Sequence, residues 1–338
     1  MINKIFFPSI LNSRFALLLL LFGLILGISI RFIMIFFLIE FDFSTGDNSS
    51  YIEIAQNIIN LGIYGIDNNP VVYRPPMYSF FLASIMYFFG INILLIQIIQ
   101  LLISLITGLL ITRIVAIYYS SAAPWVFLFF MFSPFESVYA SALLSENITS
   151  FFLVLVAFFL LTFSGFKKWF FAGCSLGLCC LTRDIYILLS IIIIFCSFVF
   201  SSTNFKTKLI TSFIFIISMF LIILPWSIRN YQQTDDFTLI SKGRLGYGLW
   251  LGTWAEDWKY VENDLYLQRE IIEKNSDNTD HIWKKMALER MKEDPIKVLK
   301  TYFIRAPLLW FGTRFDIFIL NKEYFPSESN SWYFLKII

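Results

Sequence analysis

Long apolar runs, separated by shorter polar segments, occupy most of the chain. A helix needs roughly 20 residues to cross the hydrocarbon core of a membrane, and several runs approach or exceed that length. The clear runs are Phe15–Ile39, Asn92–Ile117, Ala122–Tyr139, Asn147–Phe163, Trp169–Leu181, Ile185–Phe200 and Leu209–Leu224. A weaker run, Ala306–Leu320, is interrupted by Arg314 and Asp316. The pattern predicts an all-α polytopic membrane protein with about 7–8 transmembrane helices.

The first run has the features of a retained span. It is too long for a signal-peptide core, and no small-residue cleavage site follows it. Composition agrees, because 58% of the residues are hydrophobic and only 15% are charged. Soluble domains have about 45–50% apolar and about 25% charged residues. The net charge of +2 without a basic cluster argues against nucleic-acid binding.

The positions of the cysteines and of the histidine argue against a metal site built from these residues. The only histidine, His281, lies in a polar segment, whereas all the cysteines lie inside apolar runs, where they are expected to be small buried hydrophobic residues. The cysteines are Cys174, Cys179, Cys180 and Cys196.

Basic residues in the short loops predict the orientation of the chain. Cytoplasmic loops carry an excess of Lys and Arg. If the N-terminus lies inside, the basic residues of the short loops all lie on the cytoplasmic side. These residues are Lys4, Arg14, Lys167, Lys168, Lys206 and Lys208. The polar segments Glu40–Met77 and Trp226–Lys300 then lie on the outer face, which is where we expect the chemistry.

The first outer segment is predicted to contain two helices. Apolar residues at Ile54, Ile58 and Ile59 have helical spacing, and Asp47 is placed to cap that helix. The next apolar stretch, Met77–Phe89, is about 20 Å long as a helix, which is short for a span. We expect this helix to lie along the outer interface before the chain turns.

The remaining polar segment gives a weaker pattern. One helix is predicted at Asp280–Glu293, ended by Asp294-Pro295. We therefore expect a transmembrane module at 1–225 with its first outer loop at 40–91, and an external segment at 226–300. Residues 301–338 would hold a further span and the start of a truncated C-terminal part.

Two acids are candidates for catalysis. Asp47 lies just beyond the first span, near lipid, where desolvation makes a carboxylate a better proton acceptor. The alternative, that Asp47 is only a helix cap, is equally favoured by the spacing. Glu146 begins the fourth run on the same side, although an acid at a helix start is already favourable with the helix dipole.

Three arginines map to the outer boundary, namely Arg74, Arg183 and Arg229. Together they could hold a phosphate or pyrophosphate, which arginine binds in a bidentate way. The alternative for each is an interfacial anchor whose charged end reaches water. Arg31, inside the first run, is a functional candidate because intramembrane charges are rare.

An ordered set of short motifs resembles a known family. The motifs are Asp47-Asn48-Ser49-Ser50-Tyr51, Gly62-Ile63-Tyr64, Arg74-Pro75-Pro76-Met77-Tyr78, Ser145-Glu146, Gly177 to Arg183, and Pro225 to Asn230. In order, sidedness and spacing they resemble the GT-C class of membrane glycosyltransferases, in particular the bacterial branch related to aminoarabinose transferases and protein O-mannosyltransferases.

The resemblance implies a GT-C fold and transfer of a sugar from a polyprenyl-phosphate carrier to an acceptor glycan, lipid or protein. The site would lie on the outer face of the bacterial cytoplasmic membrane, as in cell-envelope and lipopolysaccharide glycosylation. Asp47 would be the general base of an inverting displacement. Arg74, Arg183 and Arg229 would bind the carrier phosphate. Supporting residues would be Tyr51, Pro75, Pro76 and Glu146.

One departure from the family bears on cofactors. Many relatives carry two adjacent acids in the first outer loop, and here the second position is Asn48. This puts in doubt any role that needs a carboxylate pair, such as metal binding, and no cofactor is expected.

Two other classes remain as alternatives. A polysaccharide polymerase or ligase would also use lipid carriers, with its main residues in a late loop. A lipid-linked sugar flippase or transporter would need polar residues deep in several spans. The polar residues here gather at one face, which favours an interfacial enzyme. The sequence specifies neither the sugar, the acceptor nor the oligomeric state.

Overall fold

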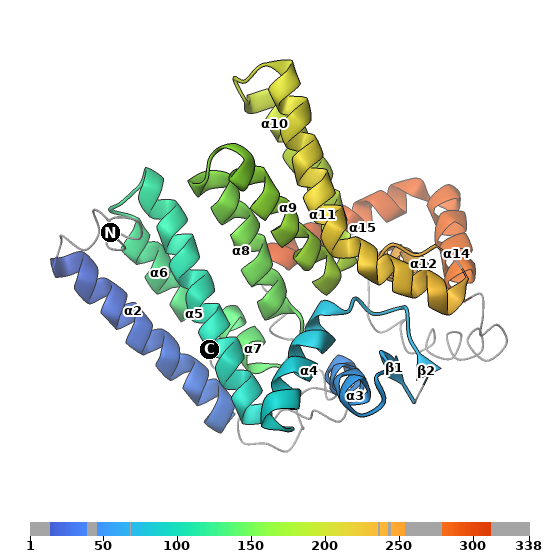
Figure 1. Cartoon of the computed structure of the whole chain (residues 1–338), viewed down its shortest axis with the longest axis horizontal. Helices are drawn as coiled ribbons and strands as arrows, with labels where there is room; N and C mark the ends of the chain where they lie inside the picture. Colours follow the sequence, from blue (N-terminus) through green and yellow to red (C-terminus); the bar gives the residue numbers. More distant parts are fainter. Residues whose placement is uncertain are drawn as a thin grey trace. The chain divides into compact units, whose positions relative to one another are not determined.

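The computed structural model describes residues 14–38, 46–67, 69–235, 237–242, 245–253 and 279–311. Helices make up most of this part of the chain (Figure 1). Two short strands, β1 (Gly65–Ile66) and β2 (Asn69–Pro70), pair as an antiparallel hairpin. The predicted all-α architecture is confirmed.

The chain divides into two compact units. Among the described residues, the first unit contains 14–71 and 75–240, and the second contains 72–74 and the residues from 241 to 311. The domain boundary expected at residue 225 falls inside a helix, α11 (Phe205–Thr234), which continues through Pro225. The apolar character ends before the helix does, which is why hydropathy alone stopped too early.

Long apolar helices in the first unit have the dimensions of membrane spans. Within the described ranges, three helices are long and apolar enough to cross a membrane: α2 (Arg14–Ile33) with its π-helical extension Met34–Leu38, α5 (Ile93–Tyr118), and α11. A fourth span is possible if a bent pair of helices, described below, counts as one. The protein is a multi-pass membrane protein, and the further spans remain predictions.

The third predicted run, Ala122–Tyr139, is not one continuous helix. It forms α6 (Ala123–Phe132) and α7 (Pro134–Ser141), separated at Ser133. Proline has no backbone N–H and disfavours a helical conformation in the residue before it, so the first helix ends there. A second break follows, because α7 meets α8 (Glu146–Thr162) at an angle of 117°.

Small residues allow close helix packing in this unit. α9 (Gly165–Thr182) lies along both α8 and α11. A Cβ atom on Gly173 would collide with the Phe215 carbonyl oxygen and the Ser218 hydroxyl, and one on Gly177 would lie 2.8 Å from the Met219 carbonyl oxygen. Close backbone approach through small residues is typical of helix pairs in membranes. A turn of 3-10 helix, Asp184–Tyr186, then leads to α10 (Ile187–Phe200).

The first span has a buried face of small and charged residues. Gly23, Gly27 and Arg31 recur every fourth residue of α2 and are its buried positions. The Arg31 guanidinium donates to the Gly27 carbonyl at 3.2 Å, the Met131 carbonyl at 2.9 Å and the Ser104 hydroxyl at 3.0 Å. Arg31 therefore satisfies a carbonyl at the end of α6, where the helix breaks.

The segment between α2 and α5 contains the two predicted helices. α3 (Gly46–Leu61) is followed by the β1–β2 hairpin and then by α4 (Met77–Phe89), whose bounds match the predicted interfacial stretch. Gly90 has φ of 72°, a conformation that glycine adopts without strain, and it turns the chain into α5. In Figure 1, α3, the hairpin and α4 lie beside the end of the helices where α8 begins.

The second unit contains α12 (Leu245–Gly252), α14 (Thr279–Glu293) and α15 (Pro295–Phe311). The helix predicted at Asp280–Glu293 is confirmed. Trp250 and Trp283 are buried against each other, with ring centroids 4.4 Å apart, and form the centre of this small core. The weak apolar run Ala306–Leu320 is helical up to Phe311, and its remainder lies outside the described residues.

Candidate active site

The helix α3 carries the first candidate acid. Asp47 is partly buried in its first turn, where a negative charge is favourable with the helix dipole. The Ser50 hydroxyl donates to the Asp47 backbone carbonyl at 3.0 Å. Because Tyr51 follows Asp47 by four residues, the two lie on the same face of α3. The position of Tyr51 therefore indicates where the Asp47 face of the helix packs.

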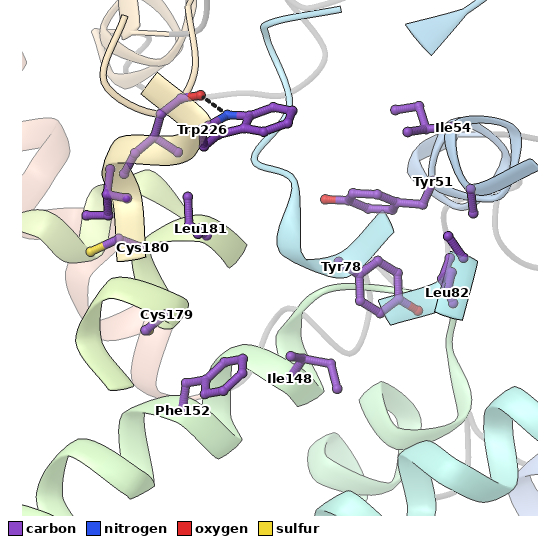
Figure 2. Close-up of a cluster of buried hydrophobic side chains, with 14 of the residues drawn as sticks. Tyr51, Ile54, Tyr78, Leu82, Ile148, Phe152, Cys179, Cys180, Leu181 and Trp226 are labelled. Carbon is purple, nitrogen blue, oxygen red and sulfur yellow. Dashed lines mark hydrogen bonds between the residues drawn. The ribbon is translucent and has the colours of Figure 1, made fainter. Parts of the chain in front are cut away.

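Tyr51 packs edge-on against Tyr78 at the start of α4, with ring centroids 4.9 Å apart (Figure 2). Both side chains are buried in the main hydrophobic core. Burial raises the pKa of the Tyr78 hydroxyl well above its ordinary value, and the nearby Tyr51 and Glu146 add to the effect. Tyr78 donates to Gln100 Oε1, and Asn147 near the start of α8 donates to the Gln100 carbonyl, so the start of α8 lies close to this tyrosine pair.

An ion pair joins two predicted site residues. Arg183 Nη2, just after α9, lies 3.2 Å from Glu146 Oε1 at the start of α8. The side chains are 48% and 24% exposed, respectively, so the pair lies at a boundary and not in the core. One turn into α8, Thr149 donates to the Thr182 hydroxyl at 3.1 Å, which holds the same two helix ends together. The ion pair thus holds the half-exposed positive charge of Arg183 close to Glu146.

Arg229, near the end of α11, contacts the backbone of the first outer loop. Its Nη1 donates to the Val71 carbonyl at 2.7 Å, and its Nη2 donates to the Tyr64 carbonyl at 2.8 Å. The guanidinium also lies over the rings of Trp226 and Tyr64, at 4.8 Å and 5.4 Å from their centroids. These contacts give Arg229 a loop-holding role that sequence reasoning did not predict.

The residues of the Pro-rich element, Arg74-Pro75-Pro76, belong to different units of the chain. Arg74 belongs to the second unit, is buried, and lies with its guanidinium carbon 5.9 Å from the Tyr73 ring centroid. Pro75 and Pro76 belong to the first unit. The Pro75 carbonyl accepts from the Tyr64 hydroxyl at 3.1 Å, and the Pro76 carbonyl accepts from a backbone N–H in the first turn of α4 at 3.0 Å.

Two residues that the sequence did not single out lie at the same end of the first unit. Gln97 Nε2 donates to the Ser141 carbonyl at 2.8 Å. Gln100, one turn later in α5, bonds to Tyr78 and to the chain between α7 and α8. The only available signal was the presence of two amides in an apolar run, which gives no indication of their partners.

The first unit therefore brings several predicted residues to one end of its helices: Tyr51, Glu146, Arg183 and Arg229, with Asp47 one turn from Tyr51. Arg74 is described separately because it belongs to the other unit. Within the described ranges, no group of three or more His, Cys, Asp or Glu side chains is placed to hold a metal ion.

Comparison with known proteins finds a similarity over the central part of the chain. Residues 73–228 match the family described as dolichyl-phosphate-mannose-protein mannosyltransferase. No curated protein and no solved structure matches the chain. The family match supports a glycosyltransferase of the GT-C class that uses a polyprenyl-phosphate-linked sugar.

Proposed function

We propose that this protein transfers a sugar from a polyprenyl-phosphate carrier to an acceptor hydroxyl on the outer face of the bacterial cytoplasmic membrane. The observation that carries the proposal is the gathering of polar residues at one end of apolar helices. There the Glu146–Arg183 ion pair is linked, through Gln100 and the Tyr51–Tyr78 pair, to the helix that bears Asp47. A carrier has its phosphate at the membrane boundary and its chain in lipid, so both parts would find suitable surroundings there.

The direction of the helices supports the proposed sidedness. Glu146 starts α8 and Arg183 follows α9, so their ion pair requires the two helices to run antiparallel. Lys167 and Lys168, in the first turn of α9, then lie at the opposite end from the proposed site. Lysine-rich short loops are favoured on the cytoplasmic side, which would put the site outside and the N-terminus inside.

In the proposed reaction, Asp47 accepts the proton of the acceptor hydroxyl. The acceptor oxygen forms a bond to the anomeric carbon while the bond from that carbon to the carrier phosphate breaks. The electron pair of the broken bond leaves with the polyprenyl phosphate, and attack from the opposite side inverts the anomeric configuration. Asp47 supplies the base, while positioning and charge stabilisation supply much of the remaining catalysis.

We assign Arg183 to the leaving phosphate. Arg183 is half exposed, and within the described ranges its ion pair is to one oxygen of Glu146, so its other donors can serve a ligand. Arginine suits phosphate because its planar group presents paired N–H donors. Arg229 is assigned chiefly to holding the loop, since its two terminal nitrogens already donate to carbonyls. Tyr51, Glu146, Pro75 and Pro76 are proposed to support this arrangement.

The proposal is tested by Asp47→Asn in proteoliposomes supplied with labelled polyprenyl-phosphate sugars and membrane acceptors. Removing a general base is expected to lower kcat by about 10²- to 10⁴-fold. Binding of the carrier, measured by photocrosslinking, should be retained, because the amide keeps the shape of the carboxylate.

A matched control comes from the same helix. Glu53 is also an acid on α3, and its Oε1 accepts from the Asp67 N–H at 2.8 Å. Glu53→Gln keeps that acceptor and is expected to keep transfer. Normal transfer by Asp47→Asn would refute the general-base role. Absence of transfer by the parent protein from any carrier would refute the enzyme itself and favour a flippase or transporter.

We further propose that the reaction needs no metal cofactor. The reason is Asn48, which puts a neutral amide beside Asp47 where a second acid would strengthen cation binding. Transfer by the purified protein should therefore persist in excess EDTA. Loss of transfer with EDTA and recovery with added Mg²⁺ or Mn²⁺ would contradict this.

A further inference from the structure

Gln100 connects two parts of the first unit through a fully buried side chain. Its Oε1 accepts from the Tyr78 hydroxyl at 2.7 Å. Its Nε2 donates to the Ala142 carbonyl at 2.7 Å and to the Ala140 carbonyl at 3.2 Å. Its own backbone carbonyl accepts from Asn147 Nδ2 at 2.9 Å. One residue of α5 thus uses both ends of its amide and its backbone.

On one side of Gln100 lies the helix that bears the proposed base. Tyr78 belongs to α4 and packs edge-on against Tyr51 of α3 (Figure 2). Tyr51 follows Asp47 by one helical turn on the same face. The hydrogen bond to Gln100 fixes the position of the Tyr78 ring. Because Tyr78 packs against Tyr51, it also influences the position of the end of α3 that carries Asp47.

On the other side lies the sharp bend between α7 and α8. Residues 142–145 are not helical, so carbonyls at the end of α7 have no intrahelical partner. A buried carbonyl without a donor is costly in apolar surroundings. Gln100 supplies donors to two of these carbonyls, and the chain then enters α8 at Glu146.

We infer that Gln100 is a positioning residue, which fixes the Asp47-bearing helix relative to the start of α8 that carries Glu146. The inference rests on the proposed transferase function. An amide suits this role because it is both an acceptor for Tyr78 and a double donor for carbonyls. A carboxylate would lack the donors, and an apolar residue would lack both.

A residue that only stabilises the fold would behave differently from a positioning residue. Loss of stability alone lowers the amount of active protein and leaves the kcat and KM of the folded fraction unchanged. Displacement of a catalytic helix lowers kcat in the folded fraction while carrier binding is preserved. Kinetics normalised to folded protein, with peptide-level hydrogen exchange, separates the two cases.

The test uses Gln100→Met, which keeps the length of the side chain, and Tyr78→Phe, which removes one hydroxyl. Displacement of a catalytic group by about 1 Å can lower the rate by roughly 10²-fold, so for Gln100→Met we expect a drop in kcat of about 10-fold or more, with the carrier KM within about threefold. Hydrogen exchange should rise in α3 and in residues 140–147. Tyr78→Phe should raise exchange in α3 only.

The matched control is Gln97→Met. Gln97 is an amide one turn earlier in α5, and its Nε2 donates to the Ser141 carbonyl, whereas the Tyr78 hydroxyl donates to Gln100. We expect its loss to raise exchange at residues 140–147 while α3 keeps the exchange of the parent protein. The comparison isolates the link to α3.

Two results would overturn the inference. One is normal kcat and normal α3 exchange in Gln100→Met. The other is an equal rise of α3 exchange in Gln97→Met, which would mean general loosening of α5. If Gln100→Met fails to fold, Tyr78→Phe alone decides, and unchanged kcat and α3 exchange in it would overturn the inference. Failure of the parent protein to transfer sugar would refute the proposed function separately.

Discussion

Arg229 gives the sharpest prediction, because its contacts separate holding the loop from binding phosphate. Two charged donors reach carbonyls at 2.7 Å and 2.8 Å, and hydrogen bonds to charged groups contribute about 1.5–3 kcal/mol each. The side chain is only partly buried, so the lower value applies, or about 3 kcal/mol for the two bonds. Arg229→Ala should therefore raise the opening equilibrium of the hairpin by roughly 100-fold.

A lysine at the same position gives an intermediate result. Its ammonium keeps the charge but cannot direct two parallel donors at separate carbonyls in the same way. Arg229→Lys should retain about half of the stabilisation, which corresponds to an increase in hairpin opening of roughly 10-fold. Both effects are measured by hydrogen exchange of peptides covering β1 and β2 in nanodiscs, with carrier affinity measured in parallel. Arg183→Ala, which leaves the hairpin contacts intact, is the control.

The reasoning would be refuted by the opposite pattern. If Arg229 served chiefly as a phosphate ligand, Arg229→Ala would weaken carrier binding strongly while hairpin exchange stayed at the parent level. Arg229→Lys would then preserve carrier binding because it preserves the positive charge. Hairpin exchange at the parent level in Arg229→Ala would remove the loop-holding role.

Two further predictions concern the helix packing. Gly173→Ala should separate α9 from α11 and lower the free energy of unfolding by about 1–3 kcal/mol, because backbone atoms cannot move aside as the end of a side chain can. The loss is measured as a lower Tm. The control is Gly248→Ala, which has open space around it and should leave Tm unchanged or higher. Arg31→Met should lower the free energy of unfolding by about 1–3 kcal/mol, because it leaves the buried Gly27 and Met131 carbonyls without their donor and removes the positive charge that acts on Glu136. The double variant with Glu136→Gln should recover part of that loss in the same assay, and no recovery would exclude electrostatic coupling between the two.

Hydropathy predicted most of the helices because lipid-spanning segments must be apolar and must satisfy their backbone internally. The run Asn92–Ile117 became α5 almost residue for residue, and Met77–Phe89 became α4. The break at Ser133 was missed although Pro134 stands beside it, since a window average over hydropathy does not register one missing N–H. The proline that ends the helix was visible in the sequence, but the prediction gave more weight to the length of the apolar run.

The site was predictable only as a set of residue types. Glu146 and Arg183 were expected at the same boundary, and the ion pair between them agrees with that expectation. The partners of Arg229 and Gln100 are mostly backbone carbonyls, which every residue carries. A single sequence therefore contains no signal that identifies them. Such contacts depend on how helix ends meet, which follows from packing and not from motif.

The buried arginine of α2 constrains how this protein is made. When the first span leaves the ribosome, Ser104 and Met131 have not yet been synthesised, so the Arg31 donors have none of their later partners from α5 and α6. An arginine at the centre of a membrane helix costs about 2.5–3.5 kcal/mol on insertion. Arg31 lies in the last turn of α2, so its cost is smaller, and the surrounding Leu, Ile and Phe residues must outweigh it. The first span therefore enters the bilayer before these hydrogen-bond partners exist, and the Arg31 donors bind them only after α5 and α6 have been inserted. A generic hydrophobic anchor in its place would insert more readily and would leave the end of α6 without its donor.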